Sequence, residues 1–206
     1  MISFIYFDVG GVVELDFSGT NKWNEMKKDL GVNEENDAAY EAVWQRFANN
    51  ICINYDVDTL IPLLEKEAGI TFPNGYSLLN DFVNRFDVNT SIWPVITEAR
   101  KKYKIGLLTN MYPRMFPLIQ KKELLPPVKW DVIIDSSIVG CQKPDEEIFK
   151  IAEEKARVNG NEILFIDNTS QHIEAAKKLG WNTFLYNSAN PEDSSKKLSD
   201  FLKSLS

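Results

Sequence analysis

Residues 2–11 read ISFIYFDVGG, and this stretch decides the fold. Its Ile, Phe, Tyr and Val residues form an almost continuous apolar run up to Asp8, which is typical of a β-strand buried on both faces. Segments of the same form recur at residues 104–109, 131–135, 162–167 and 182–186. We therefore predict five strands, the first over residues 2–9.

Helical patterns separate the predicted strands, at residues 91–103, 112–122, 144–157 and 170–179, and a terminal helix is predicted over 191–206. Pro144 is expected in the first turn of the third of these helices, where acidic residues follow it. Because strand and helix alternate along the chain, the sheet should be parallel. The predicted fold class is α/β, a doubly wound, Rossmann-like parallel sheet.

Residues 17–88 interrupt this alternation with helical patterns at 20–30, 34–50, 57–68 and 76–86. We predict an inserted helical subdomain over 17–88 and an α/β core domain over 1–16 and 89–206. Aromatic side chains of the insertion are expected to form its core rather than a substrate cage; they are Trp23, Tyr40, Trp44, Phe47, Tyr76 and Phe82.

Composition excludes several classes of protein. The 206 residues carry a net charge of −7 and no run of basic residues, which argues against nucleic acid as a partner. Residues 1–16 read as neither a signal peptide nor a membrane span, so we predict a cytoplasmic protein with no membrane partner. Monomer and homodimer both remain open. The single histidine, His172, is expected on a helix surface, with a structural role.

Polar residues follow the predicted strands at their carboxyl ends, where open parallel sheets bind ligands. They are Asp8 with Gly10 and Gly11, Thr109 with Asn110, Lys143, and Asp167 with Asn168. Carboxylates, a hydroxyl, an amide and an ammonium group at one edge can bind a divalent cation and a phosphoryl group together.

The order of these motifs resembles the haloacid dehalogenase-like (HAD) hydrolase superfamily. An aspartate ends the first strand, LLTN follows at 107–110, Lys143 and Pro144 precede a helix, and FIDN follows at 165–168. The resemblance runs from Ile2 to about Asn187 and points to a helical-cap, phosphatase-like branch with a D-x-G-G-V first motif. The insertion stands where many members carry a helical cap.

The resemblance implies a role for each matching residue. Asp8 would be the nucleophile that forms an aspartyl-phosphate. Mg²⁺ would be held by Asp8, the carbonyl of Gly10 and Asp167, with Asn168 beside its water shell. The phosphoryl oxygens would be bound by Thr109, Asn110, Lys143 and the backbone at Gly10 and Gly11, and Lys143 would also keep Asp8 ionised.

Two residues depart from the family pattern. Gly10 stands where the second aspartate of D-x-D protonates the leaving group, and Asn168 stands where a second aspartate is common. General acid–base assistance contributes about 10²–10⁴ in rate, so its loss would slow the hydrolysis of esters with poor leaving groups. A substitute acid could be Glu14, Asp16 or a residue of the insertion.

We predict a Mg²⁺-dependent HAD-like phosphoric monoester hydrolase acting on a small phosphorylated metabolite, a sugar phosphate or a nucleotide. One alternative is a weakly active or inactive relative that binds a phosphorylated ligand or a partner, as Gly10 and Asn168 suggest. Another is a metal-independent 2-haloacid dehalogenase, in which Asp167 has no obvious purpose.

Overall fold

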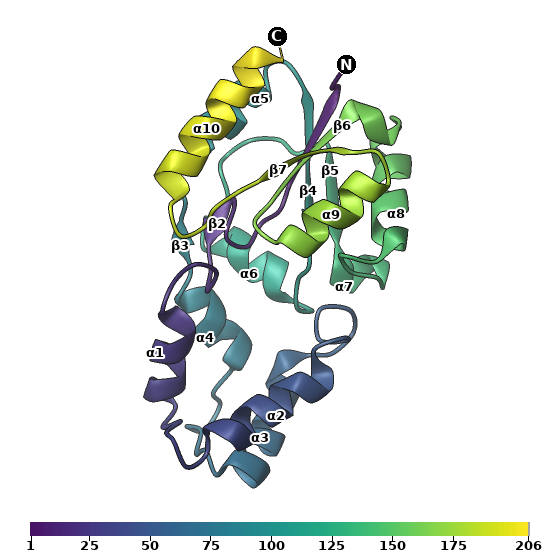
Figure 1. Cartoon of the computed structure of the whole chain (residues 1–206). Coiled ribbons are helices and arrows are strands. Elements are labelled where there is room, and N and C mark those ends of the chain that lie inside the picture. Colours follow the sequence, from purple (N-terminus) through teal and green to yellow (C-terminus); the bar gives the residue numbers. More distant parts are fainter. Residues whose placement is uncertain (206) are drawn as a thin grey trace.

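The computed structural model describes residues 1–205, and its centre is a five-stranded parallel sheet (Figure 1). The strand order is β5-β4-β1-β6-β7, every neighbouring pair is parallel, and β1 is central. The strands are β1 (Phe4–Phe7), β4 (Lys104–Thr109), β5 (Val132–Asp135), β6 (Ile163–Asp167) and β7 (Asn182–Leu185). The predicted α/β fold class and all five predicted strands are confirmed.

Helices cover both faces of the sheet. Successive strand residues point to opposite sides, and here the residues on both sides are apolar. Ile5 and Phe7 of β1 face a core that also takes in α5 (Trp93–Ala99), α6 (Met115–Lys121) and α10 (Pro191–Ser204). Phe4 and Tyr6 face the other core, with α8 (Glu146–Ala156) and α9 (Ser170–Lys178). The short helix α7 (Ser136–Val139) and the 3₁₀ helix η2 (Gly160–Glu162) complete this part of the chain. Each face of the doubly wound sheet therefore packs against its own set of helices.

Between β1 and β4 the chain forms a helical segment beyond the carboxyl edge of the sheet, whereas both chain ends lie at the opposite side (Figure 1). Its elements are α1 (Lys22–Asp29), α2 (Asp37–Phe47), the 3₁₀ helix η1 (Val57–Leu60), α3 (Ile61–Ala68) and α4 (Leu78–Asn84). Two short antiparallel strands, β2 (Glu14–Leu15) and β3 (Asp87–Val88), connect this segment to the rest of the chain.

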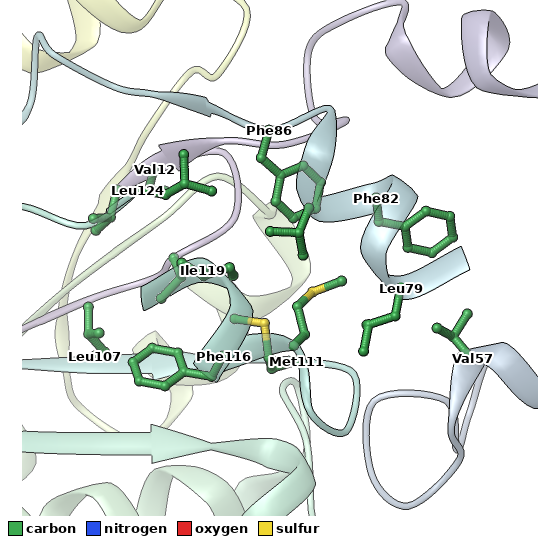
Figure 2. Close-up of a cluster of buried hydrophobic side chains, with 14 of the residues drawn as sticks. Val12, Val57, Leu79, Phe82, Phe86, Leu107, Met111, Phe116, Ile119 and Leu124 are labelled. Atoms are coloured by element: carbon green, nitrogen blue, oxygen red, sulfur yellow. The ribbon is translucent and has the colours of Figure 1, made fainter. Parts of the chain in front are cut away.

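Aromatic rings gather inside the helical segment, as predicted. Tyr40, Trp44 and Phe82 are buried, and Trp23 lies edge-on to Trp44 with ring centres 5.3 Å apart. Apolar contacts continue from this segment to the sheet: Figure 2 shows Leu79 and Phe82 of α4 in one cluster with Met111 and residues of α6. The helical segment thus shares an apolar core with the elements around β4.

Some boundaries differ from prediction. Pro144 precedes α8 and lies outside it, since the helix begins at Glu146 after the N-cap residue Asp145. The β2–β3 ribbon and α7 were not predicted, because segments of two and four residues are too short to show periodicity. No helix within residues 1–205 has both the length and the apolar composition needed to cross a lipid bilayer.

Candidate active site

Three polar residues meet at the carboxyl edge of the sheet because their strands are neighbours. Asp8 directly follows the central strand β1, Thr109 ends β4 and Asp167 ends β6. Phe7 is paired with Leu107 on one side and with Ile166 on the other, so Asp8 lies level with Leu108 and Asp167, and Thr109 is one residue further along β4. The structure therefore brings together residues that are far apart in the sequence.

Lys143 joins the two carboxylates. Its Nζ lies 2.9 Å from Asp8 Oδ1 and 2.6 Å from Asp167 Oδ2, and it also donates to the carbonyl oxygen of Leu108 at 2.9 Å. The side chain of Lys143 is fully buried. A buried ammonium group is stable only with such partners, so Lys143 is fixed between Asp8 and Asp167.

The two carboxylates titrate differently. Burial raises the pKa of Asp8 to about 6, and the nearby Asp167 charge adds to this effect, although Lys143 opposes it. Burial also acts on Asp167, but Lys143 and His172 outweigh it and lower the pKa of Asp167 to about 2. Burial acts to lower the pKa of Lys143, yet the two carboxylates raise it overall. At neutral pH the cluster thus holds an ammonium ion and two carboxylates, of which Asp8 is the more easily protonated.

Asn110 has a different contact from the one expected. Its Nδ2 donates to the carbonyl oxygen of Lys143 and its Oδ1 accepts from the Lys143 backbone N–H, both at 2.8 Å. The amide therefore fixes the loop that carries Lys143 and is not turned towards a phosphoryl group.

Thr109 does present a free group: its hydroxyl is buried and has no hydrogen-bond partner within residues 1–205. A buried hydroxyl without a partner is costly, which is the state expected of a ligand-binding group.

The turn after β1 is closely packed. Gly11 has φ +73°, and a Cβ there would lie 2.7 Å from Ser188 Oγ and would also collide with the Asn168 amide. Ser188 donates to the carbonyl oxygen of Gly11 at 2.7 Å and accepts from Asn168 Nδ2 at 2.9 Å. Asn168 therefore braces the turn through Ser188, a residue that was not singled out from the sequence. Only glycine fits at position 11.

His172 lies in the first turn of a helix, α9, as predicted, but the expected surface position is wrong because its side chain is only 14% exposed. Its Nδ1 lies 3.2 and 3.1 Å from the two carboxylate oxygens of Asp167. One ligand atom each of Asp8, Asp167 and His172 lies within 4.8 Å of the others, a grouping that could hold a metal ion. Asp167 and His172 are five residues apart across the start of α9, and this spacing is the only sequence signal that could have placed the ring here.

A cavity of about 130 Å³ adjoins the turn after β1. Its lining includes Gly10, Glu14, Asp16, Asn110 and Tyr112. Burial raises the pKa of Glu14 well above its usual range, and it raises that of Asp16 although hydrogen bonds from Ser18 oppose this. Glu14 Oε2 is buried and has no hydrogen-bond partner in the described part of the chain. The cavity therefore carries two carboxyl groups beside the Asp8 turn.

Comparison with known proteins points to one family. The sequence model of one protein family, the haloacid dehalogenase-like hydrolases, matches residues 29–180. Pig bifunctional epoxide hydrolase 2 is 26% identical over 129 residues, which are 58% of this chain and 23% of that protein. A phosphatase of Mycobacterium tuberculosis is 30% identical over 95 residues, 45% of this chain and 43% of that protein. The chain thus spans less than half the length of these curated relatives.

Solved structures share the fold over almost the whole chain. A predicted HAD-like hydrolase from Porphyromonas gingivalis has a TM-score of 0.76 at 23% identity and covers 98% of both chains. A HAD family enzyme from Bacteroides thetaiotaomicron, solved with magnesium and inorganic phosphate, has a TM-score of 0.68 at 19% identity and covers 91% of this chain and 96% of that one. A 2-haloacid dehalogenase from Pseudomonas syringae has a TM-score of 0.63 at 15% identity, with full coverage of both chains. At these identities the likeness establishes the fold.

Proposed function

Because the chain belongs to the haloacid dehalogenase-like hydrolases, we propose that it is a Mg²⁺-dependent phosphatase of a small phosphorylated metabolite, acting through an aspartyl-phosphate intermediate. One observation carries the proposal: the buried Lys143 ammonium group is held between Asp8 and Asp167, at the strand edge that also carries the Thr109 hydroxyl, which has no hydrogen-bond partner within residues 1–205. These groups match the needs of a bound phosphoryl group, which are a nucleophile, a cation and a hydrogen-bond donor.

The residues present fit a magnesium ion. Carboxylate and carbonyl oxygens are the ligands that Mg²⁺ prefers, and two buried carboxylates face a single ammonium group here, so negative charge remains for a cation to neutralise. Asp8, Asp167 and the carbonyl of Gly10 would hold the ion, and Asn168, whose Nδ2 donates to Ser188, would offer its Oδ1 to the water shell of the ion. Bound Mg²⁺ would reduce the repulsion between the Asp8 carboxylate and the phosphate.

The orientation of Asp8 suits nucleophilic attack. The Val9 N–H donates to Asp8 Oδ1 at 2.8 Å, and Lys143 contacts the same oxygen. These contacts fix the carboxylate and leave Oδ2 as the oxygen that attacks phosphorus. Lys143 favours the ionised form of Asp8 and would balance charge that develops on the phosphoryl oxygens.

The size of the cavity limits how much of a substrate it can hold. The cavity beside Gly10 has a volume of about 130 Å³, slightly less than the roughly 150 Å³ of an apolar cavity that takes up benzene, so it can enclose only a small part of a substrate. A sugar phosphate and a nucleotide both remain candidates. The helical segment, residues 17–88, would act as the cap that closes this cavity and excludes water.

Phosphate release from a panel of sugar phosphates, nucleotides and acetyl phosphate tests the proposal, with Mg²⁺ and with EDTA. We expect Mg²⁺-dependent turnover that disappears in Asp8→Asn, which keeps the shape of the side chain but not its nucleophilicity. Asp87→Asn is the matched control, because the Asp87 carboxylate is 70% exposed and pairs with Lys22.

Three outcomes would contradict the proposal. Turnover that EDTA leaves unchanged would remove the role of Mg²⁺. Halide release from a 2-haloacid would favour the dehalogenase alternative. No turnover above the Asp8→Asn background, together with phosphate binding by calorimetry, would favour a binding protein.

A further inference from the structure

The space where a side chain at position 10 would project is filled by a carboxyl group from elsewhere. A Cβ built on Gly10 would lie 2.6 Å from Asp16 Oδ2 and 3.3 Å from Asp16 Cγ, and its three nearest neighbours all belong to Asp16. Gly10 does not have a positive φ, so its backbone would accept a side chain. Asp16 is thus the neighbour that a side chain at position 10 would meet first.

The fold holds Asp16 in this place. The chain turns back after β1, and Gly10 forms an isolated β-bridge with Glu14, which returns the following residues to the Asp8 turn. The Ser18 N–H donates to Asp16 Oδ1 at 2.7 Å. With Oδ1 held in this way, Oδ2 is directed at Gly10, and both residues line the same cavity.

We propose that Asp16 is the general acid and base of this enzyme, in place of the aspartate that Gly10 lacks. The inference rests on the proposed phosphatase function and concerns the same site. It assigns the role to one of the carboxyl groups that the sequence leaves open. Glu14 lines the cavity as well, but none of its atoms is among the three that lie nearest to a Cβ at position 10.

In the first step Asp8 Oδ2 forms a bond to phosphorus while the bond from phosphorus to the ester oxygen breaks. The proton on Asp16 Oδ2 passes to that oxygen, and the leaving group departs as a neutral alcohol. In the second step Asp16 takes a proton from a water molecule whose oxygen bonds to phosphorus. The bond between phosphorus and Asp8 breaks, inorganic phosphate leaves, and Asp16 is protonated again.

Leaving groups of different basicity separate this role from a structural one. Asp16→Asn retains an oxygen for the Ser18 N–H but cannot donate or take the proton. For a primary alkyl phosphate we expect kcat/KM to fall by about 10²–10⁴, the usual contribution of a general acid. For 2,4-dinitrophenyl phosphate, whose leaving group needs no proton, we expect a fall of less than about tenfold. Rapid acid quenching with this substrate should show more phosphoenzyme in Asp16→Asn than in the wild type, because the base of the second step is missing.

Asp87→Asn, which changes an exposed carboxylate, is the control and should keep the wild-type ratio of kcat/KM for the two substrates. Glu14→Gln tests the other carboxyl group of the cavity and should change this ratio much less than Asp16→Asn does. A relocation variant gives an independent readout. Gly10→Asp alone places its side chain against Asp16, whereas Gly10→Asp with Asp16→Gly moves the carboxyl group into the same space. We expect the double variant to recover activity on the alkyl ester relative to Asp16→Gly. Urea unfolding of each variant checks that the fold is intact.

An equal loss on both substrates in Asp16→Asn, or a change of the substrate ratio in Glu14→Gln as large as that in Asp16→Asn, would overturn the assignment to Asp16 while leaving the phosphatase function in place. A wild type that releases phosphate from neither ester would overturn both proposals.

Discussion

Replacement of Lys143 by methionine should strongly destabilise the protein. Its side chain is fully buried, and its Nζ lies 2.6 Å from Asp167 and 2.9 Å from Asp8, whose side chains are 0% and 10% exposed. Removal of one member of a buried ion pair costs about 3–5 kcal/mol, because the remaining charge has no partner. For a chain of this size each kcal/mol lowers Tm by about 2–4 °C, so Tm should fall by about 6–20 °C.

This loss should depend on pH. The pKa of Asp167 is about 2 in the folded protein, below its usual value, so its stabilising contribution is present at neutral pH and is lost only as pH falls through that range. Without Lys143 the pKa of Asp167 and that of Asp8, already about 6, should both rise. Protonation then relieves the unpaired charge, and the deficit of Lys143→Met should be smaller at pH 5 than at pH 8.

Urea unfolding in EDTA, followed by the fluorescence of the five tryptophans, measures these differences. Lys150→Met is the matched control, because Lys150 is 68% exposed in an ion pair with Glu146 and should contribute little. Lys143→Met with Asp167→Asn should recover part of the loss, since one unpaired charge is removed. A loss below about 1 kcal/mol at pH 8, or an equal loss at both pH values, would refute the reasoning on buried ion pairs.

Three further outcomes are expected. Gly11→Ala should cost more stability in urea unfolding than Gly31→Ala, because both residues have positive φ but only Gly11 has side chains within 4 Å of an added Cβ; equal costs would contradict this. Glu14→Gln should raise Tm at pH 8 and change it little at pH 4. Burial raises the pKa of Glu14 in the folded protein, so the folded state loses stability as pH rises above the usual pKa of a glutamate, and the variant avoids this loss; an equal change in Tm at both pH values would contradict the reasoning. Millimolar Mg²⁺ should raise Tm in the wild type and not in Asp167→Asn, and an equal rise in both would contradict the proposed ligand set.

The fold was predictable because its three central strands, β4, β1 and β6, are buried on both faces. Continuous apolar runs such as 163–166 are typical of strands in a covered sheet, and the helical patterns between them imply parallel order. The β2–β3 ribbon was not predictable, since Leu15 and Asp87 are far apart in the sequence and the pairing involves two residues on each strand. Pro144 was placed inside α8 because helix-start signals tolerate a shift of a residue or two.

The polar edge of the site followed from topology, because residues after neighbouring parallel strands must lie together. The direction of each side chain did not follow. Asn110 turned to the backbone of Lys143, and Asn168 turned to Ser188, because each amide found nearby partners that only the folded chain supplies. Asp16 was one of several candidate acids, and it is separated from Glu14 because the three atoms nearest to a Cβ at position 10 all belong to Asp16.

The short β2–β3 ribbon has a consequence for how this chain can change. Because Leu15 pairs with Asp87, the polypeptide leaves and re-enters the sheet-bearing part at adjacent positions, and the spacing of those positions is independent of what lies between them. A tight hairpin turn would suffice to join them. Helices between Leu15 and Asp87 can therefore be lengthened, exchanged between relatives or replaced in design with the register of the five parallel strands kept, as long as the apolar contacts of α4 with α6 are replaced as well.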